Sequence, residues 1–151
     1  MTYQDSALTA AHAEVKAELA RTDTKASLLL AFTGAMLAGA WTVATSVHLP
    51  PAAVAFGAVG VAVLLAAAAL LLLTVRPNLG GAEPAGFPHW ATLTPDEICT
   101  ALSQDMRAAH IATLSRIAVR KFARLQRAID LTCTAGALLV VAALLAAGGA
   151  R

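Results

Sequence analysis

Four arginines lie at helical spacing in the later half of the chain, with successive steps of four, four and three residues. At this spacing they form one edge of an α-helix, and an apolar set falls on the opposite side. Guanidinium groups match phosphate oxygens, so Arg116 and Arg120 are candidates to bind a phosphate-bearing ligand. Alternatively, these bases contact anionic lipid headgroups and set the orientation of the chain in a membrane, or pair with acids of the N-terminal helix. The arginines are Arg116, Arg120, Arg124 and Arg127, the apolar set is Leu114, Ala118, Phe122, Leu125 and Ile129, and the candidate ligand-binding residues are Arg116, Arg120, Lys121 and Arg124.

Charged residues also lie where two apolar segments begin. Asp23 and Lys25 precede the first apolar segment, and Asp130 precedes the last. A charge at the edge of a bilayer is costly unless it is paired or reaches water. We therefore expect a structural ion pair between neighbouring helices, joining Asp23 or Asp130 to Lys121 or Arg127. A proton relay is the less favoured alternative, because no ionisable group lies at the middle of the apolar segments.

Other chemistry has little support in the sequence. The four histidines fall in four different segments, and the two cysteines lack the spacing of a metal or redox site. No nucleophile motif and no glycine-rich phosphate loop precedes a helix. We therefore expect no metal, no cofactor and no enzyme activity. The histidines are His12, His48, His89 and His110, and the cysteines are Cys99 and Cys133.

The distribution of charge predicts an all-α membrane protein. Of the 151 residues 58% are hydrophobic and 13% are charged, against about a quarter charged in soluble proteins. No charged residue falls between Lys25 and Arg76, or between Asp130 and Arg151. A crossing needs roughly 20 apolar residues, so the first gap holds two transmembrane helices, 26–46 and 52–74, and the second holds one, 131–151.

The bases also predict an orientation. Residues 1–25 hold three of the eleven bases and residues 76–130 hold seven, whereas the hairpin at 47–51 holds none. Bases near span ends stay in the cytoplasm. We therefore expect the N-terminus inside and the C-terminus outside, with the first span uncleaved. The net charge of +2 then reflects a membrane face and indicates no nucleic acid partner.

Two of the spans are expected to continue into long cytoplasmic helices. Residues 1–25 carry an apolar stripe, which predicts an amphipathic helix continuous with the first span. Residues 76–93 are rich in Pro and Gly and predict a cytoplasmic loop. Thr94, Pro95 and Glu97 form a capping box that starts a basic amphipathic helix, predicted to run unbroken over 94–130 into the third span.

Small residues recur at four-residue steps in the first two spans. They are Ala31, Ala35 and Gly39 in the first, and Ala53 and Gly57 in the second. This spacing lets helices approach closely, either within one chain or between subunits. Because the long basic helix can bury its apolar side on only one other helix of the same chain, we expect a homo-oligomer.

Three segments together resemble the Pycsar effector transmembrane family. They are ARTDTKASLL at 20–29, followed by a glycine-containing span; VRP at 75–77; and LSRIAVRKF at 114–122, with Leu125 and Ala128 after it. The resemblance covers nearly the whole chain. Asp23, Lys25 and Lys121 match the recurring polar positions of that family.

The resemblance implies an effector of bacterial antiphage defence in the inner (plasma) membrane. In such a system a nucleotide cyclase makes a cyclic pyrimidine mononucleotide, and the effector then impairs the membrane. Some cyclic-nucleotide effectors carry a β-roll sensor domain, which this chain lacks. A nucleotide would therefore bind the helical cytoplasmic part, or a separate protein would sense it. The alternatives are a small channel or transporter subunit, and a structural membrane scaffold without a ligand.

Overall fold

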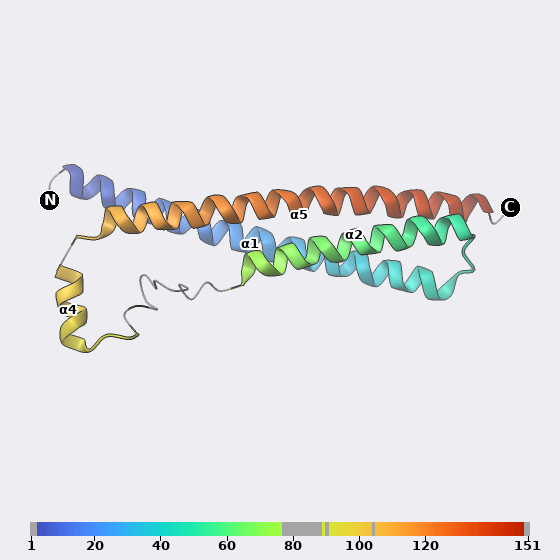
Figure 1. Cartoon of the computed structure of the whole chain (residues 1–151). Coiled ribbons are helices and arrows are strands. Elements are labelled where there is room, and N and C mark those ends of the chain that lie inside the picture. Colours follow the sequence, from blue (N-terminus) through green and yellow to red (C-terminus); the bar gives the residue numbers. More distant parts are fainter. Residues whose placement is uncertain (1–2, 77–88, 90, 104, 150–151) are drawn as a thin grey trace. The chain divides into compact units, whose positions relative to one another are not determined.

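The computed structural model describes residues 3–76, 89, 91–103 and 105–149. Four α-helices make up nearly all of this part of the chain, and it contains no strand (Figure 1). They are α1 (Tyr3–Ser46), α2 (Pro51–Val75), α4 (Pro95–Ser103) and α5 (Arg107–Gly149). Three of them, α1, α2 and α5, are long and apolar enough to cross a membrane. The predicted all-α class with three membrane-length helices is confirmed.

Two consecutive prolines separate α1 from α2. Pro51 is the first residue of α2, a position where the fixed proline backbone fits and no N–H is needed. Val54 donates its backbone N–H to Pro50 O at 3.1 Å, which closes the first turn. The hairpin between the first two apolar segments therefore follows from Pro50 and Pro51.

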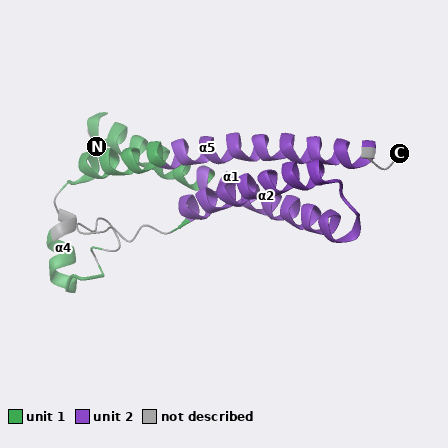
Figure 2. Ribbon diagram, turned by 45° about the vertical axis from the view of Figure 1, so that its right-hand side comes forward, with its two compact units in different colours: residues 1–21, 76–120 green, residues 22–75, 121–151 purple. Residues whose placement is uncertain are grey.

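The chain divides into two compact units (Figure 2). Unit 1 comprises residues 1–21 and 76–120, and unit 2 comprises residues 22–75 and 121–151. Helices α1 and α5 each contribute residues to both units. Unit 2 holds all of α2 and the apolar parts of α1 and α5.

Alanine and leucine side chains form the core of unit 2. Ala26, Leu71, Leu125 and Ala128 form one buried cluster, which takes a side chain or more from each of its three helices. Ala26 and Ala128 let the backbones of α1 and α5 approach closely. Thr74 lies one turn after Leu71 on α2 and is fully buried. Its hydroxyl donates to Leu70 O at 2.8 Å, so this buried hydroxyl has a hydrogen-bond partner.

The helix predicted over 94–130 is instead two helices, and this part of the prediction is wrong. Helix α4 ends at Ser103, Asp105 and Met106 are not helical, and α5 begins at Arg107. The Asp105 carboxylate accepts the backbone N–H of Arg107 at 3.1 Å. Aspartate competes in this way with intrahelical hydrogen bonds, so it favours the start of a helix over its interior.

The predicted start of α4 is confirmed. Glu97 Oε2 accepts the backbone N–H and the hydroxyl of Thr94, both at 2.8 Å. The Glu97 N–H in turn donates to Thr94 Oγ1 at 3.5 Å, which completes a long capping box. The backbone N–H of Thr94 is the main cause that holds the pKa of Glu97 below its usual value. Most of the loop predicted over 76–93 lies outside the described residues.

Candidate functional site at the Asp23–Lys121 ion pair

An ion pair joins α1 to α5 in unit 2. Lys121 Nζ lies 2.6 Å from Asp23 Oδ1, and the two side chains are 18% and 43% exposed. The pairing expected for Asp23 is therefore confirmed with Lys121 as its partner. Lys121 is the more buried of the two, so removing the carboxylate would leave a poorly solvated ammonium without a counter-charge.

The residues beside Asp23 explain why the two helices come so close. Thr22 and Ala26 are one turn apart on α1, and both are buried. They extend the apolar stripe of the N-terminal residues, so the helix face predicted from the sequence is the one that packs. Lys121 lies one turn before Leu125, which belongs to the buried cluster. The ion pair therefore borders the apolar core of unit 2.

A second base of α5 reaches the end of α2. Arg124 Nη1 donates to Leu73 O at 3.4 Å, and α2 ends at Val75. The last carbonyl groups of a helix have no intrahelical partner and carry partial negative charge, so a cation is favourable there. Lys121 and Arg124 thus attach α5 to both other helices of unit 2.

The four predicted ligand-binding residues all belong to α5 and are divided between the two units. Arg116 and Arg120 belong to unit 1 and are exposed, whereas Lys121 and Arg124 belong to unit 2 and are engaged with α1 and α2. Arg116 Nε donates to Ala112 O in its own helix at 3.2 Å. The guanidinium of Arg120 makes no hydrogen bond or ion pair within the described chain.

The other charged residues near the span ends are exposed. No ion pair joins Lys25, Arg127 or Asp130 to another described residue. The backbone carbonyl of Asp130 accepts the Thr134 hydroxyl at 2.8 Å, a contact within α5. The alternative pairing of Asp130 with Arg127 therefore does not form in this part of the structure.

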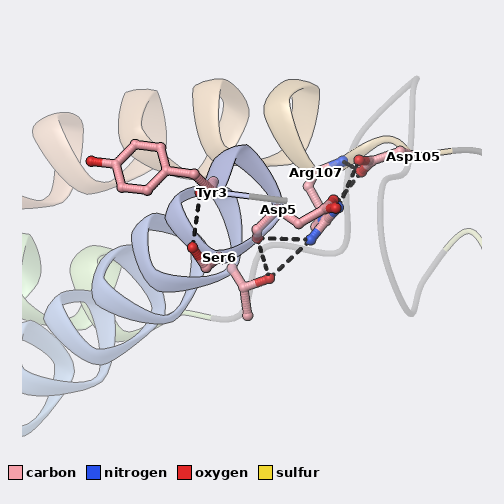
Figure 3. Close-up of polar contacts among 6 residues, drawn as sticks. Tyr3, Asp5, Ser6, Asp105 and Arg107 are labelled. Carbon is pink, nitrogen blue, oxygen red and sulfur yellow. Dashed lines mark hydrogen bonds and ion pairs between the residues drawn. The ribbon is translucent and has the colours of Figure 1, made fainter. Parts of the chain in front are cut away.

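A polar cluster around Arg107 in unit 1 has no counterpart among the sequence predictions (Figure 3). Arg107 Nη2 lies 2.7 Å from Asp5 Oδ1 and 2.8 Å from Asp105 Oδ2. Arg107 Nη1 also donates to Thr9 Oγ1 at 2.9 Å and to Asp5 O at 3.2 Å. This one guanidinium therefore ties the start of α5 to the first turns of α1.

The hydrogen bonds of this cluster favour the charged forms of Asp105 and Arg107. The Arg107 side chain donates to the Asp105 carboxylate, which lowers the pKa of Asp105 to about 2. The same hydrogen bond, followed by the one to Asp5, raises the pKa of Arg107. Asp105, two residues before Arg107, could have indicated the local part of this cluster from the sequence. The contact with Asp5 could not be predicted in this way, because Asp5 is about a hundred residues away.

Two histidines lie close together, each about one turn after a residue of this cluster: His12 follows Thr9 on α1, and His110 follows Arg107 on α5. The ring centroids of His12 and His110 are 6.4 Å apart, with the rings tilted by 31°. Partial burial, and then Lys16, His110 and Arg107, lower the pKa of His12 from its usual value of 6.5. Among the described residues, no group of three or more potential metal ligands forms here or elsewhere.

The comparisons with known proteins point to one family. The family model of the Pycsar effector protein domain, PycTM, matches residues 7–148, which is nearly the whole chain. No curated protein and no solved structure matches the chain. The match includes Asp23, Lys25 and Lys121, and two of these three residues form the ion pair.

Proposed function

The chain belongs to the Pycsar effector family, and from that premise we propose that it is the effector that impairs the bacterial inner membrane when a cyclic pyrimidine mononucleotide is produced. Membership of the family places the protein in a Pycsar antiphage system and makes it a multi-pass membrane protein. The nucleotide, the loss of membrane integrity and the placement in the inner membrane are the parts we propose. A nucleotide cyclase would be the functional partner.

The observation that carries this proposal is the Asp23–Lys121 ion pair. It lies beside the apolar core of unit 2 and joins two of the three membrane-length helices. Because one partner is largely buried, the relative placement of α1 and α5 at this point is sensitive to charge. Such an element can occupy two arrangements, and a ligand shifts the balance if it binds one of them better.

The exposed arginines of α5 are the candidate receptors for the nucleotide phosphate. Arg116 and Arg120 are exposed and one turn apart, so both guanidinium groups can reach one phosphate from the same side of the helix. A hydrogen bond to a charged group contributes about 1.5 to 3 kcal/mol. Helix α5 is a single helix from Arg107 to Gly149, so a ligand on Arg116 acts on the element that also carries Lys121.

Co-expression with a pyrimidine cyclase tests the proposal. We expect cells that make both proteins to admit a membrane-impermeant dye, and cells that make either protein alone to exclude it. Arg116→Ala and Arg120→Ala should each reduce dye entry about tenfold, as expected for the loss of one charged hydrogen bond. Membrane insertion of each variant is confirmed by fractionation.

Arg127→Ala is the matched control, because it removes another exposed arginine from the same helix without touching the candidate receptor. It should leave dye entry unchanged. If all three variants lose activity equally, the arginines act through net charge at the lipid surface and the receptor assignment is wrong. If wild type admits no dye while the nucleotide is shown to accumulate, the effector function itself is refuted.

A further inference from the structure

The three helices of unit 2 pack closely at the ion pair and separate toward the hairpin. The buried residues of α1 are Thr22, Ala26 and Thr33, and none follows Thr33. Met36 of α1 still lies near α5, since a Cβ built on Gly136 would be 3.7 Å from Met36 Cε. A Cβ built on Gly39 would meet no heavy atom within 4 Å. Helix α1 therefore diverges from its neighbours after Met36.

Helices α2 and α5 stay together over the same region. A Cβ on Gly60 would lie 3.2 Å from Leu139 Cγ, and one on Gly57 would lie 3.9 Å from Ala142 Cβ. The result is a groove of about 1040 Å³ with α1 on one side and α2 and α5 on the other. It lies entirely within unit 2, and its lining on α1 begins at Met36.

The lining of the groove is apolar along its length and polar at one end. No Asp, Glu, Lys or Arg lines it, and its polar side chains apart from Trp41 are Thr45, Ser46 and His48, at the hairpin. The Thr45 hydroxyl already donates to Trp41 O at 3.0 Å, so it needs no further partner. Trp41 lies one turn from this polar end, and tryptophan is favoured at the boundary between hydrocarbon and headgroups.

We propose that this groove binds one phospholipid of the leaflet on the hairpin side. Its acyl chains would lie between α1 and the α2–α5 pair, and its headgroup would lie near Ser46 and His48. The groove is formed by helices apolar enough to cross a membrane, so lipid is the molecule present around it. An empty space of this size would forfeit dispersion contacts on all its walls, and an apolar lining does not hold water.

The shape of the groove favours a lipid over a helix of a second copy. A helix with its side chains is about 10 Å wide along its whole length, whereas the space between α1 and α5 narrows toward Met36, which lies near Gly136. A flexible acyl chain fits a tapering space. The apolar lining of the groove matches the acyl chains of a lipid, and its polar end matches a headgroup. A transmembrane helix in the groove would give no reason for the polar end.

Two glycines of α1 provide a matched test. Gly39 lines the groove and Gly34 does not, and a Cβ on either would meet nothing within 4 Å. Gly39→Leu should therefore fill the groove without a clash, and Gly34→Leu makes the same substitution outside it. The protein is extracted in mild detergent, stripped of loosely bound lipid in steps, and weighed by native mass spectrometry.

We expect wild type and Gly34→Leu to retain one phospholipid per chain after the loosely bound lipid is gone. Gly39→Leu should retain about tenfold less, because the new side chain occupies the space of several methylene groups. Fluorescence gives an independent reading in a Trp90→Phe background, where Trp41 is the remaining tryptophan. Brominated phospholipid should quench it less in Gly39→Leu than in Gly34→Leu.

Any of four results would overturn the proposal. Wild type could retain no phospholipid, or Gly39→Leu could retain as much as Gly34→Leu. Alternatively, wild type could run as a lipid-free dimer that Gly39→Leu alone converts to monomer, which would assign the groove to a second copy of the chain. Quenching that is the same in both variants would contradict the placement of the acyl chains beside Trp41.

Discussion

At the scale of single residues, Lys121 is a largely buried charge whose described counter-charge is Asp23. Asp23→Asn should destabilise the protein by about 1 to 3 kcal/mol, between the values for exposed and for fully buried pairs. The reason is that Lys121 is 18% exposed while Asp23 is 43% exposed. Thermal unfolding in detergent measures the loss, and Lys25→Met, which removes an exposed and unpaired base, should shift the midpoint little.

The double variant separates pairing from unrelated damage. Asp23→Asn with Lys121→Met removes both charges, so its loss of stability should be smaller than the sum of the two single losses. Strictly additive losses would show that the 2.6 Å contact contributes nothing in the membrane protein.

His12 makes the contact between the N-terminal turns of α1 and α5 sensitive to pH. Partial burial, and then Lys16 of α1 and His110 and Arg107 of α5, hold its pKa below 6.5, so the packed state disfavours the charged ring. Packing is therefore strongest well above pH 6.5 and weakens as the pH falls through that value to the lowered pKa.

Amide hydrogen exchange measures this effect. After correction for intrinsic rates, residues 8–16 should exchange faster at about pH 5.5 than at about pH 7.5. His12→Gln should reduce the difference, because the glutamine does not titrate. Equal protection at both pH values in wild type would contradict the role of His12.

At the scale of elements, α2 and α5 are held together where a glycine replaces a side chain. A Cβ on Gly60 would lie 3.2 Å from Leu139 and 3.3 Å from Leu138 Cβ, and the second of these atoms cannot move without its backbone. Gly60→Leu should therefore destabilise the protein by about 1 to 3 kcal/mol through overpacking.

Gly57→Ala is the control for that substitution. Its Cβ would make an ordinary contact of 3.9 Å with Ala142, so the unfolding midpoint in detergent should hardly change. A Gly60→Leu protein as stable as Gly57→Ala would show that α2 and α5 are not packed as described.

At the scale of the whole molecule, three membrane-length helices place the two termini on opposite sides if all three cross. Because of the excess of bases at 1–25 and 76–130, we expect those segments to stay in the cytoplasm. An alkaline phosphatase fused after Arg151 should therefore be active, and one inserted near Gly86 should be inactive. Activity at Gly86 would reverse the predicted orientation, and equal expression of the two fusions is the necessary control.

The sequence by itself determined the three membrane-length helices, the hairpin and one helix start of this protein. Charge-free gaps on either side of residues 76–130 located three apolar helices, because a bilayer excludes charge over about twenty residues. Pro50 and Pro51 located the hairpin, Thr94 and Glu97 located a helix start, and the stripe around Thr22 and Ala26 located the packed face of α1. Each of these features depends on residues close together in the sequence, and the Pycsar family motif is likewise made of short segments.

Only the tertiary structure decided which distant residues meet. Asp23 had two candidate bases, and the choice of Lys121 required the register between α1 and α5, which side-chain periodicity does not specify. The Arg107 cluster joins Asp5 to residues about a hundred positions away, and the break at Asp105 arises because that carboxylate caps α5 instead of lying inside one long helix. The divergence of α1 after Met36 depends on how the side chains of three helices pack together. The spacing of small residues in the sequence therefore could not predict the groove that this divergence opens.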